Sequence, residues 1–401
     1  MCNIMSILLL AGGLMTMTVS AKQGSEMKVI PYPKKITTLP GTFQLSNATR
    51  VVVKDKTLVP LSEILADGIY RHTDIKLKAS SGAVARGTIV LSLDPTLKEE
   101  EYTLVIGDTV EIKGGDYRAV AWAAATLLQL IETEGGKYYL PKLSIEDRPT
   151  AQYRGVMLDV ARRWHPAETL KDTITLLWMY KINYLHLHLS DNQSFVFPSK
   201  SLPKLATEGR SYSSAEMDDI VKFADEHGVT IIPEIDMPGH AGSWVVKMPE
   251  AFGTTDPKTG KSRSVGIVNM VNEKAYTALD KLIGDLADVF KSSPYIHIGT
   301  DEVGAGGLIQ LPEYKEYCEK HGLTEALEGR AHELYLHFVF RMNEMVRKHG
   351  RQTIAWSDFG GAGTPNVTIP TNLIAMAWTG SPVNLAQKKY PGEFKSEAQR
   401  R

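Results

Sequence analysis

Apolar and polar positions along the chain follow two different patterns, and the change comes at Arg148-Pro149. Before that point, short β-branched runs end at Gly, Asp or Pro, as strands joined by turns do. These runs are Arg50–Val53, Thr88–Leu91 and Tyr102–Ile106. Between them, Ser62–His72 and Tyr117–Glu132 carry apolar residues at helical spacing. We therefore expect a small α+β domain over residues 27–149, with a mostly antiparallel sheet.

After Arg148-Pro149, short apolar strands alternate with amphipathic helices. The expected strands are Tyr153–Val160, Ile182–Leu189, Thr230–Ile235, Tyr295–Gly299, Thr353–Trp356 and Leu373–Trp378, and the clearest helices are Ala215–His227, Lys274–Phe290 and Ala331–His349. Strands that are too apolar to face water on either side are typical of a parallel sheet with helices outside it. We predict an α/β fold, a (β/α)8-type TIM barrel over residues 150–401.

This barrel is expected to be incomplete. A closed barrel of this type has about eight strands, and the pattern shows about six. Roughly the last 20 residues are rich in Lys, Gln, Glu and Arg and show no strand pattern. An incomplete barrel leaves two open sheet edges.

Composition and charge narrow the class of partner. Apolar residues make up 43% and charged residues 23%, the balance of a soluble globular protein with a large core. The 45 basic and 46 acidic residues leave a formal net charge of −1 and no basic face. Nucleic acid is therefore excluded as an expected partner, whereas a neutral substrate fits.

The N-terminus has the pattern of a secretory signal peptide over residues 1–21. Ile4–Val19 is apolar, and Val19-Ser20-Ala21 offers small residues for cleavage, although no Lys or Arg precedes the apolar run. We expect an exported protein, periplasmic or secreted, without a membrane span. The alternative is that this segment is buried in the mature fold.

Once such a leader is removed, Cys318 is the one cysteine left. An intrachain disulfide and a two-cysteine metal site are then both excluded. We expect no cofactor and no metal, and the sequence does not indicate an oligomeric state.

Side chains that can do chemistry concentrate after the predicted strands. They are Asp159, His186, His188, Asp191, Glu234, Asp236, His240, Asp301, Glu302, Trp356 and Trp378. Carboxyl ends of strands are where barrel enzymes place their active sites. Burying so many polar groups without a function would cost several kcal/mol, roughly, for each one left unpaired. This concentration predicts an active site at that end of the barrel.

Asp301 and Glu302 form the centre of this group. Adjacent side chains on a regular strand point to opposite faces, so the two carboxylates share a site only where the strand breaks, which Gly299 favours. Two close carboxylates cannot both ionise freely, and one pKa is raised. The alternative for Asp-Glu alone is a solvated acidic turn.

Several motifs in order resemble the signature set of family 20 glycoside hydrolases, the β-N-acetylhexosaminidases. The sequence has His-x-Gly-x-Asp-Glu at His297–Glu302, His-x-His-Leu-x-Asp at His186–Asp191 and Pro-Glu-Ile-Asp-x-Pro-Gly-His at Pro233–His240. Arg154–Arg162 resembles the first barrel strand of the family, and Ala123–Leu130 resembles the last helix of its accessory N-terminal domain. The match runs from about Val29 to Trp378.

The resemblance implies an exo-acting enzyme that releases terminal N-acetylhexosamine from glycans with retention of configuration. Glu302 would be the general acid and base, and Asp301 would orient the substrate's acetamido group while its carbonyl oxygen attacks the anomeric carbon. Asp191 and His240 would form a buried chain that positions Glu302. Arg154 would grip the 3- and 4-hydroxyls of the sugar.

The resemblance also implies that Trp356 and Trp378 wall the pocket around the N-acetyl group. This chain departs from the family at Ser194-Phe195-Val196, where Gly-Trp-Arg is usual, and at Thr300, where Gly is usual. We expect the family's C-terminal Tyr, Trp and acidic residue, which hold the acetamido group and the sugar, to have no counterpart here.

Three alternatives compete with this interpretation. A metal-dependent hydrolase could use His186, His188, His240, His297 and Asp301 as zinc ligands, and chelation would then abolish its activity. A truncated homologue could bind sugar weakly or be inactive. Some single assignments also have structural alternatives: Arg154 could pair with Asp159, His186 and His188 could be supporting groups, and either Trp could be barrel core.

Overall fold

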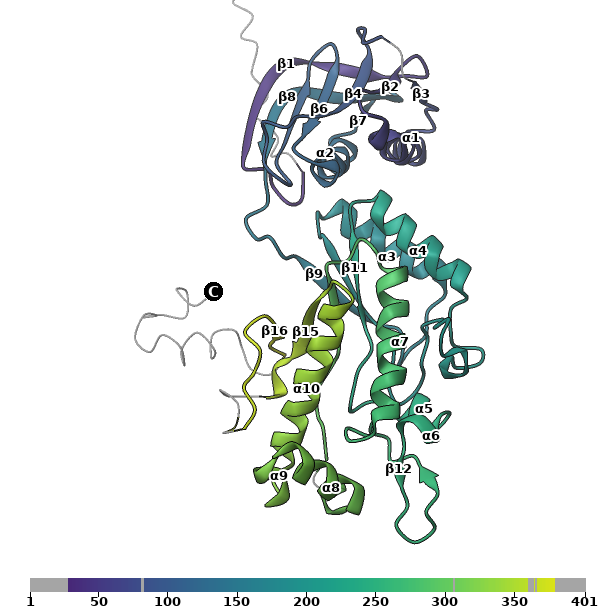
Figure 1. Ribbon diagram of the computed structural model, residues 1–401. Helices are drawn as coiled ribbons and strands as arrows, with labels where there is room; N and C mark the ends of the chain where they lie inside the picture. The colour runs from purple at the N-terminus through teal and green to yellow at the C-terminus, as the bar shows by residue number, and fades with distance from the viewer. Residues whose placement is uncertain (1–27, 81–82, 306, 360–363, 365, 379–401) are drawn as a thin grey trace, which may run out of the picture.

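A computed structural model describes residues 28–80, 83–305, 307–359, 364 and 366–378 in two lobes joined by the segment between Asp147 and Gly155. One lobe is a sheet with two helices on one face, and the other is a curved sheet with helices outside it (Figure 1). The predicted signal peptide over residues 1–21 lies outside the described residues. Among the described helices, none is both long enough and apolar enough to cross a membrane.

The N-terminal lobe contains a mixed sheet in the order β1-β8-β5-β6-β4-β2-β3, with β7 paired to β8. Its strands are β1 (Lys35–Leu45), β2 (Arg50–Val53), β3 (Lys78–Ser80), β4 (Thr88–Leu93), β5 (Tyr102–Ile106), β6 (Val110–Gly114), β7 (Glu132–Glu134) and β8 (Lys137–Asp147). Pairs from β1 to β6 are antiparallel, whereas β6-β4, β4-β2 and β2-β3 are parallel. Helix α1 (Val59–Thr73) carries the chain back across the sheet between β2 and β3, which lets these two strands run parallel.

Helix α2 (Tyr117–Gln129) lies between the two lobes and contacts both of them. Asp116 caps its first turn by accepting a hydrogen bond from the backbone N–H of Ala119 at 2.7 Å. Its alanine-rich stretch is buried on nearly every side, because one face packs on the sheet and another packs on helix α3 (Ala167–Met179) of the second lobe. The indole of Trp178 on α3 donates to the carbonyl oxygen of Ala121 at 2.8 Å, which fixes the two helices in register.

The second lobe is built on a parallel sheet in the order β9-β10-β11-β14-β15-β16. The strands are β9 (Gly155–Asp159), β10 (Tyr184–His188), β11 (Thr230–Glu234), β14 (Tyr295–His297), β15 (Gln352–Trp356) and β16 (Ile374–Met376). The main helices that follow α3 are α4 (Ser214–Glu226), α7 (Glu273–Val289) and α10 (Ala331–Lys348). Shorter elements are α5 (Gly242–Val245), α6 (Pro249–Phe252), α8 (Pro312–His321), α9 (Thr324–Leu327), β12 (Thr254–Thr255) and β13 (Ser262–Arg263), with 3₁₀ turns at Lys56–Leu58, Pro203–Leu205, Leu308–Gln310 and Ser357–Phe359.

Neighbouring strands of this sheet are consecutive along the chain, and helices cover its outer face, as in a TIM-type barrel (Figure 1). The predicted fold class is confirmed, although every strand except β15 is shorter than its predicted apolar run. Within the described residues the sheet is open, with β9 and β16 at its edges. Val156 and Met157 on β9 are 38% and 40% exposed, which is unusual for an apolar strand of this fold.

Candidate active site

Strand register aligns a row of polar side chains across the sheet. Asp159, His188, Glu234 and His297 are direct partners on β9, β10, β11 and β14. Residues paired in this way point to the same face of a sheet, and residues two apart on one strand share that face. His186 and Trp356 therefore join the row on the inner face of the curved sheet, whereas the leucines that alternate with the histidines on β10 face the helices.

The end of β14 breaks in a way that brings two adjacent carboxylates to one site. Gly299, Thr300 and Glu302 have φ values of 70°, 91° and 52°, so the chain leaves the extended conformation immediately after the strand. A Cβ atom on Gly299 would lie 1.7 Å from Oδ1 of Asp236. Only glycine fits there, as the sequence suggested. The Thr300 N–H donates to the same Asp236 oxygen at 3.1 Å, which holds the loop.

His240 connects the adjacent carboxylates to Asp191. Its Nε2 atom lies 3.5 Å from Oδ2 of Asp301 and 3.5 Å from Oε2 of Glu302. Its Nδ1 atom lies 3.3 Å from Oδ1 of Asp191. The hydrogen bond to Asp191 raises the pKa of His240 against the opposing effect of burial. The structure thus brings together four residues that the sequence predicted to form one site.

The carboxyl group of Asp191 is held in its ionised form by its hydrogen-bond partners. Burial alone would raise its pKa, but hydrogen bonds from His188 and His240 hold that pKa well below its usual range. The guanidinium of Arg162 contributes further, with its NH2 atom 2.6 Å from Oδ2 of Asp191. Asp191 therefore stays ionised and presents a fixed negative charge to His240.

Asp236 lies beneath Asp301 and is fully buried. Burial, together with the negative charges of Glu234 and Asp301, raises the pKa of Asp236 well above its usual range. Oδ2 of Asp236 and Oδ1 of Asp301 have no hydrogen-bond partner elsewhere among the described residues. A protonated Asp236 can therefore donate to Asp301 and hold its carboxylate in place. The clear upward shift in this cluster falls on Asp236, which was not among the predicted catalytic residues.

The two predicted tryptophans are tied to carboxylates in different ways. Trp356 is half-buried at the end of β15 and donates its indole N–H to Oε1 of Glu234 at 2.9 Å. Trp378 is 46% exposed and donates to Oδ1 of Asp358 at 2.5 Å. The other oxygen of Asp358 accepts the backbone N–H of Glu302 at 3.0 Å. Trp378 is thus linked through one residue to the catalytic loop, and its role as a pocket wall stays a prediction.

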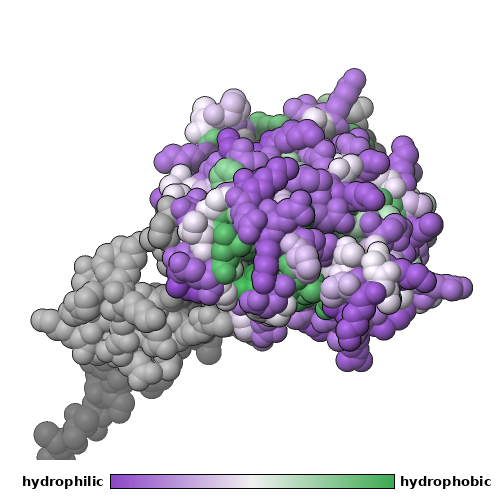
Figure 2. Space-filling model, turned by 60° about the horizontal axis from the view of Figure 1, so that its bottom comes forward, coloured by the Kyte–Doolittle hydropathy of each residue, from purple (hydrophilic) through white to green (hydrophobic). Residues whose placement is uncertain are grey.

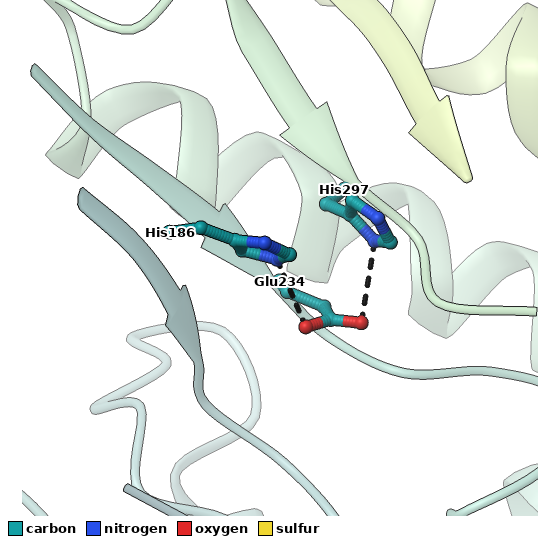
Figure 3. A group of neighbouring side chains, drawn as sticks. All are labelled: His186, Glu234 and His297. Carbon is teal, nitrogen blue, oxygen red and sulfur yellow. Dashed lines mark ion pairs between the residues drawn. The ribbon is translucent and has the colours of Figure 1, made fainter. Parts of the chain in front are cut away.

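Glu234 occupies the centre of the inner face, and Figure 3 shows His186 and His297 pointing toward it from the strands on either side. Oε2 of Glu234 lies 2.9 Å from Nε2 of His186 and 2.7 Å from Nδ1 of His188. Oε1 lies 3.2 Å from Nδ1 of His297. Burial alone would raise the pKa of Glu234, but the neighbouring histidines hold it well below its usual range.

This histidine–glutamate cluster does not suit a metal ion, although one ligand atom from each of His186, Glu234 and His297 lies within 4.8 Å of the others. Both oxygens of Glu234 already accept hydrogen bonds, from His188 and from the indole of Trp356. Nδ1 of His297 accepts the Gly299 N–H at 3.0 Å, so its lone pair is also occupied. Zinc would have to displace these hydrogen bonds, so this set of donors does not favour the metal-dependent alternative.

Arg154 does not belong to this site, and its predicted role is corrected. It precedes β9 and therefore lies at the amino end of the sheet, opposite the catalytic loop. Its guanidinium pairs with Glu100 of the N-terminal lobe, and its Nε atom donates to the carbonyl oxygen of Lys181 at 2.7 Å. It does not pair with Asp159 either, so the structural alternative was also wrong in its partner.

Arg162 is the arginine that the sequence interpretation missed. It follows β9 at the carboxyl end, and its NH1 and NH2 atoms contact Asp159 at 2.8 Å and Asp191 at 2.6 Å. Its side chain is 43% exposed, so part of the guanidinium remains open to a ligand. The sequence contained enough information to choose Arg162, because it lies in the segment Arg154–Arg162 and follows the predicted strand.

The surroundings of the site are open and polar. A cavity of about 360 Å³ lies beside Glu302 and is bordered by Thr300, Tyr335 and Asp358. Figure 2 shows that the face toward which these strands run is mainly hydrophilic, with a smaller hydrophobic area near its centre. A larger cavity of about 590 Å³ lies at the amino end near Glu100. Glu302 lines the smaller cavity, whereas the larger one lies at the other end of the sheet, so size alone does not identify the active site.

Two family models match the chain, one over each lobe. Residues 152–393 match the model of the glycosyl hydrolase family 20 catalytic domain, and residues 26–148 match that of domain 2 of the same family. Among curated relatives, a β-hexosaminidase from Vibrio furnissii is 28% identical over 85% of this chain and 58% of its own length. One from Porphyromonas gingivalis is 29% identical over 90% of this chain and 48% of its own length. The chain therefore spans about half to three-fifths of these relatives.

Solved structures show the same similarity. The exo-β-N-acetylglucosaminidase from Vibrio harveyi, crystallised with N-acetylglucosamine, superposes with a TM-score of 0.76 at 28% identity, over 90% of this chain and 59% of that one. The chitobiase from Flavobacterium johnsoniae superposes with a TM-score of 0.75 at 27% identity, over 90% of this chain and 58% of that one. Both lobes match models of one family, and the three motifs that end at Asp191, His240 and Glu302 lie at one end of the sheet. The chain therefore belongs to glycosyl hydrolase family 20.

Proposed function

We propose that this chain carries the active site of an exo-acting β-N-acetylhexosaminidase, which hydrolyses terminal, non-reducing N-acetylhexosamine from glycans. One observation carries the proposal: Asp301 and Glu302 lie side by side at the broken end of β14, each with an oxygen 3.5 Å from Nε2 of His240. Two carboxylates and a proton-bearing imidazole at one point suit glycosidic bond cleavage.

Glu302 is the general acid in this proposal. Its side chain is 59% exposed, so it can reach the glycosidic oxygen of a bound substrate. It donates its proton to the leaving group and later takes one from the attacking water. His240 stabilises the carboxylate that forms in the first step, because its raised pKa favours the imidazolium form.

Asp301 orients the substrate's acetamido group. Its side chain is only 16% exposed and rests on Asp236, so it is held rigidly enough to accept a hydrogen bond from the acetamido N–H. The acetamido carbonyl oxygen then attacks the anomeric carbon, and no enzyme carboxylate becomes glycosylated. Water that Glu302 deprotonates then attacks the anomeric carbon from the face that the leaving group left. The bond between the anomeric carbon and the acetamido oxygen breaks, and the configuration is retained.

Sugar binding in this proposal moves from Arg154 to Arg162. A planar fork of donors suits two neighbouring hydroxyls, and the guanidinium of Arg162 is already fixed by Asp159 and Asp191. Trp356 and Trp378 supply the apolar surface that an N-acetyl group needs. The relatives whose names include hexosaminidase or acetylglucosaminidase support this class of substrate.

The test is hydrolysis of a chromogenic N-acetyl-β-glucosaminide by the purified chain. Glu302→Gln and Asp301→Asn should each lower kcat by about 10²- to 10⁴-fold, while the exposed Glu316→Gln should not change it. A chelator should have no effect. A folded wild-type chain without turnover would instead support the inactive, truncated homologue.

We also infer that the protein is exported to the periplasm or secreted. The support is the apolar segment Ile4–Val19 followed by the small residues Val19-Ser20-Ala21. Mass spectrometry of the protein isolated from its native host should find a new N-terminus near Lys22. Recovery of an intact N-terminus from a cytoplasmic fraction would contradict export.

A further inference from the structure

We propose that His188 and Glu234 are positioning residues of this active site: a buried, charged imidazolium–carboxylate pair that fixes Asp191 and, through it, His240 and the catalytic loop. This inference rests on the proposed function for its kinetic consequences. The charge of the pair itself is a property of the fold and can be measured without turnover.

The argument starts from the number of donors. Nδ1 of His188 lies 2.7 Å from Oε2 of Glu234, and its Nε2 lies 3.0 Å from Oδ2 of Asp191. Ionised carboxylates only accept hydrogen bonds, whereas a neutral imidazole donates from one nitrogen alone. With a carboxylate oxygen at each ring nitrogen, His188 satisfies both contacts only as the imidazolium.

Burial makes this arrangement obligatory for stability. His188, Glu234 and Asp191 are 2%, 0% and 1% exposed, so water cannot replace a missing proton or partner. An unpaired carboxylate at this depth would cost several kcal/mol, roughly. Although burial opposes the charge, the two carboxylates raise the pKa of His188 to about 10.

The charged groups around His188 come from every element that packs on it. Asp159 on β9 and Glu234 on β11 are acidic, as is Asp191 in the following loop. Arg162 contributes a positive charge through Asp191. Burial lowers the pKa of His297 on β14, which favours the neutral form of its imidazole. His186, on β10 like His188, faces Glu234 with its Nε2 atom 2.9 Å from Oε2 of that carboxylate.

Charges then alternate along one continuous path. Glu234 is negative, His188 positive and Asp191 negative, and the path continues through His240, whose pKa Asp191 raises, to Glu302. Each side chain along this path is oriented by a contact with the preceding one, since every contact joins one particular oxygen to one particular nitrogen. Loss of His188 would leave Oδ2 of Asp191 held only by Arg162, whose side chain is 43% exposed, and Asp191 would then be held less firmly against His240.

Glu234 has a second task at the other end of the path. Its Oε1 atom accepts the indole N–H of Trp356, while its Oε2 accepts from His188. The buried Glu234 carboxylate therefore orients both Trp356, a predicted wall of the acetamido pocket, and His188, which begins the path to Glu302. This explains why a glutamate, rather than an apolar residue, occupies a fully buried position in the strand.

The first test uses nuclear magnetic resonance of the full chain labelled with ¹⁵N-histidine. Signals of His188 are assigned by their absence in His188→Gln. At pH 7.5 the wild type should show protons on both ring nitrogens of His188. In Glu234→Gln, which keeps the shape of the side chain but removes its charge, one of the two nitrogens should lose its proton. A wild-type His188 with one bare nitrogen, or a doubly protonated His188 in Glu234→Gln, would overturn the proposal.

The second test is kinetic. His188→Gln should lower kcat by on the order of 10²-fold while changing KM less than about threefold, because positioning rather than binding is lost. Loss of a positive charge favours the protonated form of nearby acids, so the alkaline limb of the kcat/KM profile should move to higher pH. The matched control is His227→Gln, a buried histidine on the helical side of the sheet, which should leave both properties unchanged.

These tests separate the two proposals. A wild-type chain with no turnover but a doubly protonated His188 would refute the proposed function and support the buried pair. A His188→Gln variant that folds, as shown by its thermal unfolding, and keeps wild-type kcat and pH profile would refute the positioning role. A variant that loses kcat without any shift of the alkaline limb would show a structural effect only and would also refute it.

Discussion

Two clusters of buried charge lie at opposite ends of the same parallel sheet, and they are built from different groups. At the amino end, Glu100 of the N-terminal lobe accepts from Arg154, Arg118, Trp122 and Asn183. At the carboxyl end, carboxylates face mainly histidines or one another, and Arg162 contacts two of them. The partners of Glu100 at the amino end keep one charge state, because they are arginine, indole and amide groups. Most partners at the carboxyl end are histidines and carboxylates, which can gain or lose a proton.

The two clusters also differ in how completely their polar side chains are hydrogen-bonded. Each polar side chain of the Glu100 cluster has a partner, which suits a contact that only has to hold two lobes together. At the carboxyl end, one oxygen of Asp236 and one of Asp301 have no partner within the described part of the chain. The fully paired Glu100 cluster therefore suits structural support, whereas the histidines and carboxylates at the other end are groups that can exchange protons.

The largest expected effect comes from Gly299→Ala at the carboxyl end. The added Cβ would lie 1.7 Å from Oδ1 of Asp236, at a backbone φ of 70° that alanine resists. Displacement of the catalytic loop should reduce kcat/KM by at least about 10²-fold on the chromogenic substrate. Gly307→Ala, where an added Cβ meets nothing within 4 Å, should keep full activity.

The next effect tests the amino end by stability. Glu100→Ala leaves Arg154 and Arg118 without their buried counter-charge, so we expect a loss of about 3–5 kcal/mol in the free energy of unfolding. Urea denaturation measures it, and the exposed neighbour Glu99→Ala serves as the control. Activity per folded molecule should remain normal. A loss of activity larger than the loss of folded protein would mean that the two ends are coupled.

A comparison of the two arginines sharpens the contrast. Arg162→Ala should raise KM by about 10- to 100-fold, because charge-assisted hydrogen bonds to the sugar would be lost. Arg154→Ala should lower the melting temperature and leave KM within about twofold, since it lies at the opposite end of the sheet. Initial rates over a substrate range decide the matter. The reverse result would restore Arg154 as the sugar ligand.

The smallest effect concerns pH. The folded-state pKa of His188 is raised to about 10 from 6.5, so its stabilising contribution is complete below pH 6.5 and is lost as pH rises toward 10. The stability difference between wild type and His188→Gln should shrink across that window, by a few kcal/mol at most, roughly. The deficit of Glu100→Ala should stay constant over the same range, because Glu100 has a lowered pKa and remains ionised. Urea denaturation at pH 6.5, 8 and 9.5 compares them.

Much of the fold could be predicted from the period of apolar residues. Runs such as Thr230–Ile235 became strands because a sheet covered by helices needs apolar residues on both faces. The parallel half of the N-terminal sheet could not be predicted in this way. Strand direction there depends on the path of α1 across the sheet, which local pattern does not encode.

The site could be predicted to the extent that strand ends determine it. Asp191, His240, Asp301 and Glu302 follow their strands and converge, as the position of chemistry in barrels implies. Arg154 was misplaced because it precedes its strand, and the same rule would have excluded it. The buried pair of His188 and Glu234 depends on register between β10 and β11, and no single segment of sequence contains that information.

The indole of Trp356 gives the protein a built-in optical reporter. Its N–H is bound to the Glu234 carboxylate, while the ring is only half-buried at the end of β15. The emission of such a ring responds both to the charge beside its nitrogen and to a sugar placed against its face. Of the six tryptophans in the chain, Trp356→Phe would identify its share by subtraction. Ligand occupancy could then be followed by fluorescence at equilibrium, even in variants that no longer turn over.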